Sequence, residues 1–145
     1  MIKKKSIIWL ITIFFLLLGL MPLQAAKKTD EIVLGKKIKI HSKVLKEDRS
    51  LWIYPADAQE NSEVKRPVLF LLDGNFHFHH VCGLIDSFKQ DGLVPDMLVV
   101  AIPNTDRNRD FLPTKMDRFP TSGKADRFLA FFKDELIPHV EQYYN

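Results

Sequence analysis

Asp73 and Gly74 end a run of apolar residues in the segment PVLFLLDGNFHFHH, residues 67–80. A glycine directly after a buried strand allows a sharp turn, through a positive φ or a close approach to another backbone segment. Such a turn leaves the amides of Asn75 and Phe76 free at the start of a helix, where unpaired N–H groups favour an anion. A reaction that builds negative charge on a carbonyl oxygen needs such donors. The alternative is a plain strand-to-helix turn, with Asp73 or Asn75 as its cap.

Three histidines and one cysteine follow this turn. His77 and His80 could share a helix face, but two histidines are too few for a catalytic zinc site without a further ligand from elsewhere. We therefore predict no metal and no cofactor. Cys82 is the only cysteine, so no internal disulfide can form. A lone cysteine in an apolar helix is more often a small buried residue than a nucleophile, although a Cys–His pair with the neighbouring histidines stays open.

Two apolar runs position these residues. Residues 67–73 and 96–103 are apolar on both faces, which is typical of interior strands in a parallel sheet. Before them, the alternation over residues 31–45 predicts a half-buried strand, and residues 51–55 predict a second. KEDRS, residues 46–50, is interpreted as the polar turn of an antiparallel hairpin between the two.

Two helices are predicted between and after the apolar strands. The first spans residues 75–90, and Asp91-Gly92 ends it. Four of its positions recur at helical spacing, which predicts the buried stripe Phe76, His80, Leu84 and Ser87 or Phe88. The second helix covers the last 22 residues, with Ser122 as a plausible cap and Pro138 as a kink.

Strands that alternate with helices predict an α/β fold, with an N-terminal antiparallel hairpin followed by parallel strands and flanking helices. In such sheets, ligands bind beyond the carboxyl ends of the strands. The turn at Asp73 and the polar loop of residues 103–113 both fall at that end. This edge of the sheet is therefore the predicted site.

Residues 1–25 are predicted to be a secretory signal peptide. Lysines at positions 3, 4 and 5 precede the apolar run Ile7–Met21, and PLQAA at residues 22–26 offers a small-residue cleavage site. The apolar run is about 15 residues long, shorter than the roughly 20 that a membrane-spanning helix needs. We expect a secreted or periplasmic protein with no stable membrane span after cleavage. An uncleaved membrane anchor is the alternative.

The excess of basic over acidic residues in the chain comes from the predicted signal peptide. The chain has 21 Lys and Arg against 18 Asp and Glu; three of the lysines and no acid lie in residues 1–25, which leaves 18 against 18. A neutral chain offers no electrostatic case for nucleic acid, so no nucleic-acid partner is predicted. Residues 26–145 suffice for one domain with a modest core.

Three segments resemble, in order and spacing, the first half of the putative-esterase branch of the α/β-hydrolase superfamily, which includes esterase D-like and enterochelin esterase-like enzymes. The segments are PVLFLLDGNFHF (67–78), DMLVVAIPNTDRNRDFLP (96–113) and SGKADRFLAFFKDELIPHVEQYY (122–144). Asn104–Pro113 is the most specific part. The resemblance implies a partial α/β-hydrolase sheet and the chemistry of a serine ester hydrolase.

The resemblance also implies roles for particular residues. It places one oxyanion donor in the turn after the third strand, which by position maps to the backbone of Gly74, Asn75 and Phe76. Its implied candidates for the substrate pocket are His77, Asn104, Arg107 and Asp110. Arg107 and Asp110 would shape the pocket or brace the loop. The alternative for the charged residues of this loop is a solvated mixture of charges.

The nucleophile of this fold sits in a G-x-S-x-G turn after the fifth strand and is followed by an acid and a histidine. The printed sequence contains no G-x-S-x-G, so no residue of the chain receives a catalytic role. Ser62 matches S-x-x-K, but it lies in a polar loop. We therefore expect a domain truncated before the nucleophile. Because the family's third strand lies between its fourth and fifth, residues 68–72 should form an exposed apolar edge, an aggregation hazard.

Residues 26–145 are accordingly predicted to be the N-terminal part of a secreted serine carboxylic-ester hydrolase. The chain alone should be inactive, with its catalytic Ser, Asp or Glu, and His downstream, and the partner of the whole enzyme should be a small-molecule ester. The alternative is a small secreted binding module that kept the scaffold without the catalysis. A membrane-anchored interaction protein is a third, weaker alternative.

Overall fold

The structure of this protein is a computed structural model that describes residues 31–58 and 65–144. Residues 32–145 form one compact unit. The predicted signal peptide, residues 1–25, and the S-x-x-K serine, Ser62, lie outside the described residues.

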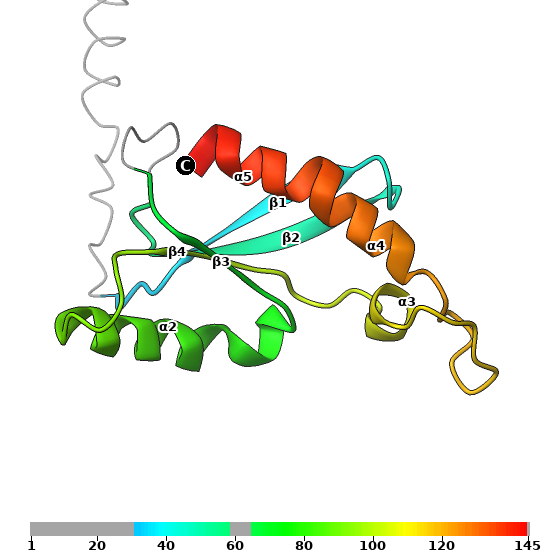
Figure 1. Ribbon diagram of the computed structural model, residues 1–145, viewed down its shortest axis with the longest axis horizontal. Coiled ribbons are helices and arrows are strands. Elements are labelled where there is room, and N and C mark those ends of the chain that lie inside the picture. The colour runs from blue at the N-terminus through cyan, green and yellow to red at the C-terminus, as the bar shows by residue number, and fades with distance from the viewer. Residues whose placement is uncertain (1–30, 59–64, 145) are drawn as a thin grey trace, which may run out of the picture. The chain divides into compact units, whose positions relative to one another are not determined.

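The compact unit is built on a mixed four-stranded sheet in the order β1-β2-β4-β3 (Figure 1). Its strands are β1 (Lys36–Ser42), β2 (Glu47–Tyr54), β3 (Val68–Leu71) and β4 (Leu98–Ala101). β2 pairs antiparallel with both β1 and β4, and β3 pairs parallel with β4. The sheet therefore confirms the predicted α/β class, with a leading antiparallel hairpin and a parallel pair of strands.

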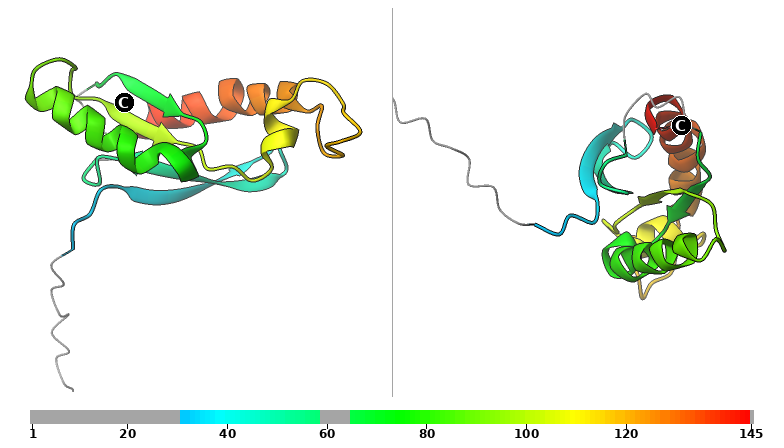
Figure 2. Two further views of the ribbon diagram at one scale, coloured as in Figure 1. Left: turned by 90° about the horizontal axis from the view of Figure 1, so that it is seen from below. Right: turned by 90° about the vertical axis from the view of Figure 1, so that its left-hand side faces the viewer.

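Helices cover both faces of this sheet. α2 (Gly74–Gln90) lies on one face, and the continuous run of α4 (Ala125–Phe131), η1 (Phe132–Leu136) and α5 (Ile137–Tyr144) lies on the other (Figures 1 and 2). A short helix, α3 (Arg107–Phe111), lies in the loop after β4. β4 is packed from both sides, and all four of its residues are fully buried. This burial explains its continuous apolar sequence.

The predicted hairpin turn at residues 46–50 is wrong. The turn occupies residues 43–46, and β2 already begins at Glu47. Arg49 therefore lies inside a strand and is 1% exposed. The polar residues suggested a solvated turn because sequence alone does not show that their charges are paired inside the fold.

The predicted buried stripe of α2 is also wrong. The helix buries a neighbouring face, formed by Gly74, Phe78, Cys82 and Ile85. Phe76, Leu84 and Phe88 are exposed by 68%, 52% and 42%. Gly74 allows this face to approach the sheet closely, whereas a larger side chain there would force the helix away.

Pro138 neither ends nor restarts the last helix, which runs on through it with a change of helix type. The turn before it, η1, is a π-helix in which the Ile137 amide donates to the Phe132 carbonyl, five residues back. A proline has no N–H for the carbonyl four residues earlier and its ring crowds that carbonyl. A wider π turn relieves this conflict without ending the helix.

β3 lies at an edge of the sheet, as predicted. Its neighbour is β4, and among the residues described no strand pairs with its other side. Two apolar side chains flank this open side, since Leu69 and Leu72 are 36% and 41% exposed. Unpaired backbone groups beside exposed leucines form a surface that can pair with another strand.

Candidate active site

The turn after β3 brings two backbone segments into contact. A Cβ added to Gly74 would lie 2.9 Å from both the Ala101 Cβ and the Ile102 nitrogen. Close approach is therefore the reason for a glycine here. The positive φ belongs to Asp73 instead, which adopts φ 53° and ψ 37° in the left-handed region.

Replacing Gly74 by alanine is expected to destabilise the domain by about 1–3 kcal/mol, as for other overpacked sites. The added methyl group meets backbone atoms of Ile102, which cannot rotate away. Gly83 is a matched control in the same helix, because nothing lies within 4 Å of a Cβ added there. Gly83→Ala should be neutral or stabilise the protein by up to about 1 kcal/mol. Urea unfolding of the two variants measures both effects, and equal effects would contradict the close approach.

Of the three backbone amides that were candidates for the oxyanion donor, one is open, meaning that it has no hydrogen-bond acceptor among the described residues. The Gly74 amide donates to the Ile102 carbonyl at 3.0 Å, and the Phe76 amide donates to the Asp73 carbonyl at 2.9 Å. The expectation of a free amide is therefore wrong for Phe76, because the turn is tight enough to close a local hydrogen bond. The Asn75 amide donates to no residue that the structure describes. It is the remaining candidate.

Asp73 and the loop after β4 are joined by hydrogen bonds. The Asp73 carboxylate accepts from the Asn104 Nδ2 at 2.6 Å, from the Arg107 Nε at 2.9 Å and from the Arg107 Nη2 at 3.3 Å. The backbone N–H of Asn104 also donates to the Asn75 Oδ1 at 3.2 Å. We call Asp73, Asn75, Asn104 and Arg107 the clamp. It fixes the two loops at the carboxyl ends of β3 and β4 to each other.

The clamp keeps Asp73 ionised. The hydrogen bond from Arg107 lowers the pKa of the Asp73 carboxyl below its usual value; burial opposes this shift, and the hydrogen bond from Asn104 adds to it. Asn104 and Arg107, predicted as pocket residues, thus hold the turn through Asp73. The pocket or loop-bracing role that the resemblance implied for Arg107 stays a prediction, and these hydrogen bonds show only that Arg107 joins the two loops.

His77 lies one turn into α2 and is exposed. Its ring packs edge-on against that of His80, with centroids 5.2 Å apart. His79 contacts Phe78 instead. Among the described residues, no group of three or more His, Cys, Asp or Glu side chains could hold a metal ion.

Asp110 is 3% exposed and lies in an internal ion network. Its carboxylate accepts from the Arg49 Nη1 at 2.8 Å and from the Arg109 Nε at 2.7 Å. Glu47 completes the network, because both arginines also donate to it. These hydrogen bonds lower the Glu47 pKa, the one from Arg109 most strongly. The guanidinium of Arg49 also lies 5.3 Å from the ring centroid of Phe128.

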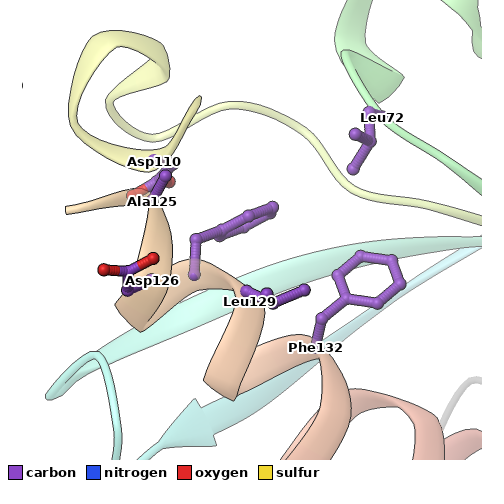
Figure 3. A pocket seen from close by; sticks show the side chains of 7 residues that line it. Leu72, Asp110, Ala125, Asp126, Leu129 and Phe132 are labelled. Atoms are coloured by element: carbon purple, nitrogen blue, oxygen red, sulfur yellow. The ribbon is translucent and has the colours of Figure 1, made fainter. Parts of the chain in front are cut away.

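Asp110 also borders an apolar hollow of about 400 Å³ beside β3. Figure 3 shows Leu72, the residue after β3, across this hollow from Leu129 and Phe132. Leu129 is 67% exposed. The hollow thus joins the open edge of β3 to the helices on that face of the sheet.

Two other residues considered in the sequence, Cys82 and Ser122, have structural roles in the folded chain. Cys82 is fully buried, and burial raises the pKa of its thiol to about 12, so the thiol stays protonated at neutral pH. Ser122 is not the cap of the last helix, because Lys124 holds the N-cap position. The Ser122 hydroxyl instead closes the preceding loop: it accepts from the Met116 amide at 2.8 Å and donates to the Phe119 carbonyl at 2.7 Å.

Sequence reasoning missed the clamp and the ion network. An acid at the end of a strand and the Asn104–Arg107 spacing were both visible, but the sequence does not show that they meet. Nothing in the sequence indicated that Arg49 and Glu47 belong to an ion network, since both were assigned to a solvated turn.

A mixed sheet with helices on both faces, and a strand–turn–helix with an open amide at its carboxyl edge, match part of the architecture of an α/β-hydrolase. Comparison with protein families agrees, since the family described as "Putative esterase" matches residues 42–145. The chain belongs to this esterase family.

Solved structures agree with this assignment. An IroE-like serine hydrolase from Shewanella oneidensis is 30% identical, with a TM-score of 0.66, over 77% of this chain and 39% of that chain. The enterobactin esterase of Shigella flexneri, solved with 2,3-di-hydroxy-N-benzoyl-serine, is 25% identical, with a TM-score of 0.55, over 78% of this chain and 26% of that one. The BES protein of Bacillus cereus shares the fold at 21% identity, with a TM-score of 0.61, over 80% of this chain and 48% of that one.

This chain therefore spans less than half the length of each of these three structures. A search of curated proteins gives no match. Within residues 31–58 and 65–144, no helix has the length and apolar character needed to cross a membrane.

Proposed function

We propose that this chain is the N-terminal part of a secreted serine carboxylic-ester hydrolase and that the Asn75 amide is one of its oxyanion donors. The observation that carries the proposal is the open Asn75 N–H at the carboxyl edge of the sheet, between two amides that already have partners. Family membership supports the reaction class. The serine hydrolase and esterase among the similar structures support it as well.

The chemistry would divide between this chain and the part of the protein that carries the nucleophile. A serine Oγ attacks the ester carbonyl carbon while a histidine, oriented by an acid, accepts the serine proton. The carbonyl oxygen becomes an oxyanion, which accepts one hydrogen bond from the turn after β3 and another from the amide that follows the nucleophile. Asn75 supplies the first of these donors. It acts only when negative charge develops, which is the condition for lowering the barrier.

The substrate in this proposal is a small-molecule carboxylic ester. The exposed side chains of Phe76 and His77, the two residues after Asn75, would line the entrance to its site. The proposal includes a signal peptide at residues 1–25, cleavage before residue 26, and a secreted or periplasmic location.

Labelling with a fluorophosphonate tests the proposal, because this reagent bonds covalently to activated serines. The protein is isolated from its natural source, labelled, digested and mapped by mass spectrometry, with the recombinant 145-residue chain treated in parallel. We expect a labelled protein whose peptides include residues 26–145 and whose modified serine lies in a G-x-S-x-G peptide outside them. The recombinant chain should stay unlabelled.

Two results would contradict this function. One is a modified serine within residues 26–145. The other is a natural protein that contains these residues, takes up no label and hydrolyses no p-nitrophenyl ester, which is the behaviour of a binding module that kept the scaffold without the catalysis.

A further inference from the structure

Asp73 occupies the N-cap position of α2 but does not cap the helix. Its side chain makes no hydrogen bond to the amides of the first turn. Aspartate is among the preferred N-cap residues because its carboxylate accepts from the second or third amide of the helix. In α2 those are the amides of Asn75 and Phe76. The Asp73 carboxylate thus turns away from the donors that it would ordinarily satisfy.

The backbone of Asp73 explains how the carboxylate is kept away. N-cap residues usually adopt extended φ and ψ angles, whereas Asp73 is left-handed, with φ 53°. That region is unfavourable for residues with a Cβ, although aspartate tolerates it better than most. The two clamp residues Asn104 and Arg107 hold the carboxylate on the far side of the turn, at 2.6 and 2.9 Å.

We propose that Arg107 and Asn104 are positioning residues that keep the Asp73 carboxylate off the first turn of α2, so that the Asn75 amide stays open. Without them, Asp73 relaxes to extended angles and caps its own helix. Its carboxylate then occupies the Asn75 amide and places a negative charge where an oxyanion would bind. This inference rests on the proposed function for its consequence in catalysis, but the capping itself is independent of any substrate.

Two sets of substitutions that break the same contacts from opposite sides separate positioning from simple loss of a contact. Asn104→Ala/Arg107→Ala removes both donors, which releases the carboxylate and leaves it free to cap. Asp73→Gly removes the carboxylate, and a glycine adopts the left-handed turn without strain. If the ion pair only braces the loops, the two variants should behave alike. If Arg107 restrains the carboxylate, they should differ.

The readout is the hydrogen-exchange rate of the Asn75 amide, measured by NMR in the full 145-residue chain. One N-cap hydrogen bond should slow exchange about fivefold, from its typical stabilising effect. We expect this slowing in Asn104→Ala/Arg107→Ala, and parental exchange in Asp73→Gly and in the triple variant Asn104→Ala/Arg107→Ala/Asp73→Gly. The amide of Val100, in the buried strand β4, reports whether each variant remains folded.

Slower exchange in Asn104→Ala/Arg107→Ala that Asp73→Gly reverses supports the inference. Unchanged exchange in a folded Asn104→Ala/Arg107→Ala variant overturns it, and so does the same change in this variant and in Asp73→Gly. No substrate enters the measurement, so its failure leaves the serine-labelling result untouched. Conversely, the absence of a labelled serine leaves the exchange result standing.

Discussion

Replacing Asn75 by proline in the proposed full-length esterase, meaning residues 26–145 together with the proposed nucleophile, is expected to lower kcat by about 10²–10³-fold. This is the usual cost of removing one oxyanion donor. Proline lacks the backbone N–H but is tolerated in the first turn of a helix, where that N–H has no helical partner. KM should change little, because the lost hydrogen bond strengthens only as charge develops on the carbonyl oxygen.

Asn75→Ala is the matched control for this substitution. It keeps the amide and removes only the Oδ1 that accepts from the Asn104 amide at 3.2 Å. We expect a much smaller loss of kcat in this variant. Steady-state kinetics on a p-nitrophenyl ester compares the two, with circular dichroism as a check of folding. Similar losses in the proline and alanine variants would show that the backbone donor plays no part.

Replacing Asp110 by alanine is expected to destabilise the domain by about 3–5 kcal/mol, the usual cost of removing one partner of a buried ion pair. Asp110 is 3% exposed and Arg49 is 1% exposed, so the arginine cannot turn to water when it loses this acid. Two positive charges would then share Glu47 alone. Urea unfolding of the full chain measures the change, against Asp117→Ala in the same loop as the control.

The control and a double variant make this prediction specific. Asp117 is exposed, and its replacement should change stability by at most about 0.5 kcal/mol. In the double variant Arg49→Met/Asp110→Leu, apolar side chains replace both buried charges, and most of the loss should be recovered. Glu47 and Arg109 still pair in that variant, with the Arg109 Nη2 2.6 Å from the Glu47 Oε1. A cost below about 1 kcal/mol for Asp110→Ala would show that the network adds little.

The parts of the fold that depend on local pattern could be predicted from the sequence. β3 and β4 are apolar on both faces because helices cover both sides of β4, and this pattern indicated their class and their parallel pairing. Pro138 disturbs the last helix by its own covalent structure. Residues 68–72 were expected at an open edge from the resemblance, and the sheet order places β3 there.

Features that depend on distant partners could not be predicted. The segment around Arg49 was interpreted as a turn, since its acid at Asp110 lies 61 positions away. The face of α2 that packs on the sheet was misjudged because its small residues, Gly74 and Cys82, carry less apolar surface than the exposed Phe76 and Leu84. A close approach to the sheet selects small residues, and periodicity alone favours large ones.

In the candidate site, too, features set by local sequence could be predicted and features set by distant partners could not. The Asp73–Gly74 turn and the loop at Asn104 were recognisable as sites from their place at the carboxyl ends of two strands. Which amide is open depends on hydrogen-bond partners in the folded chain, and two of the three candidates proved to be occupied. The clamp joins residues up to 34 positions apart, and nothing in the local sequence indicates that Asp73 faces Arg107.

The position of a bound oxyanion tests this account most directly. A crystal structure of the proposed full-length esterase, inhibited with a phosphonate that mimics the tetrahedral intermediate, would show where the negatively charged oxygen lies. We predict that oxygen about 2.7–3.1 Å from the Asn75 nitrogen, within hydrogen-bonding range for an oxyanion donor. A phosphonate oxygen bound by other donors, with the Asn75 amide turned toward solvent, would contradict the account.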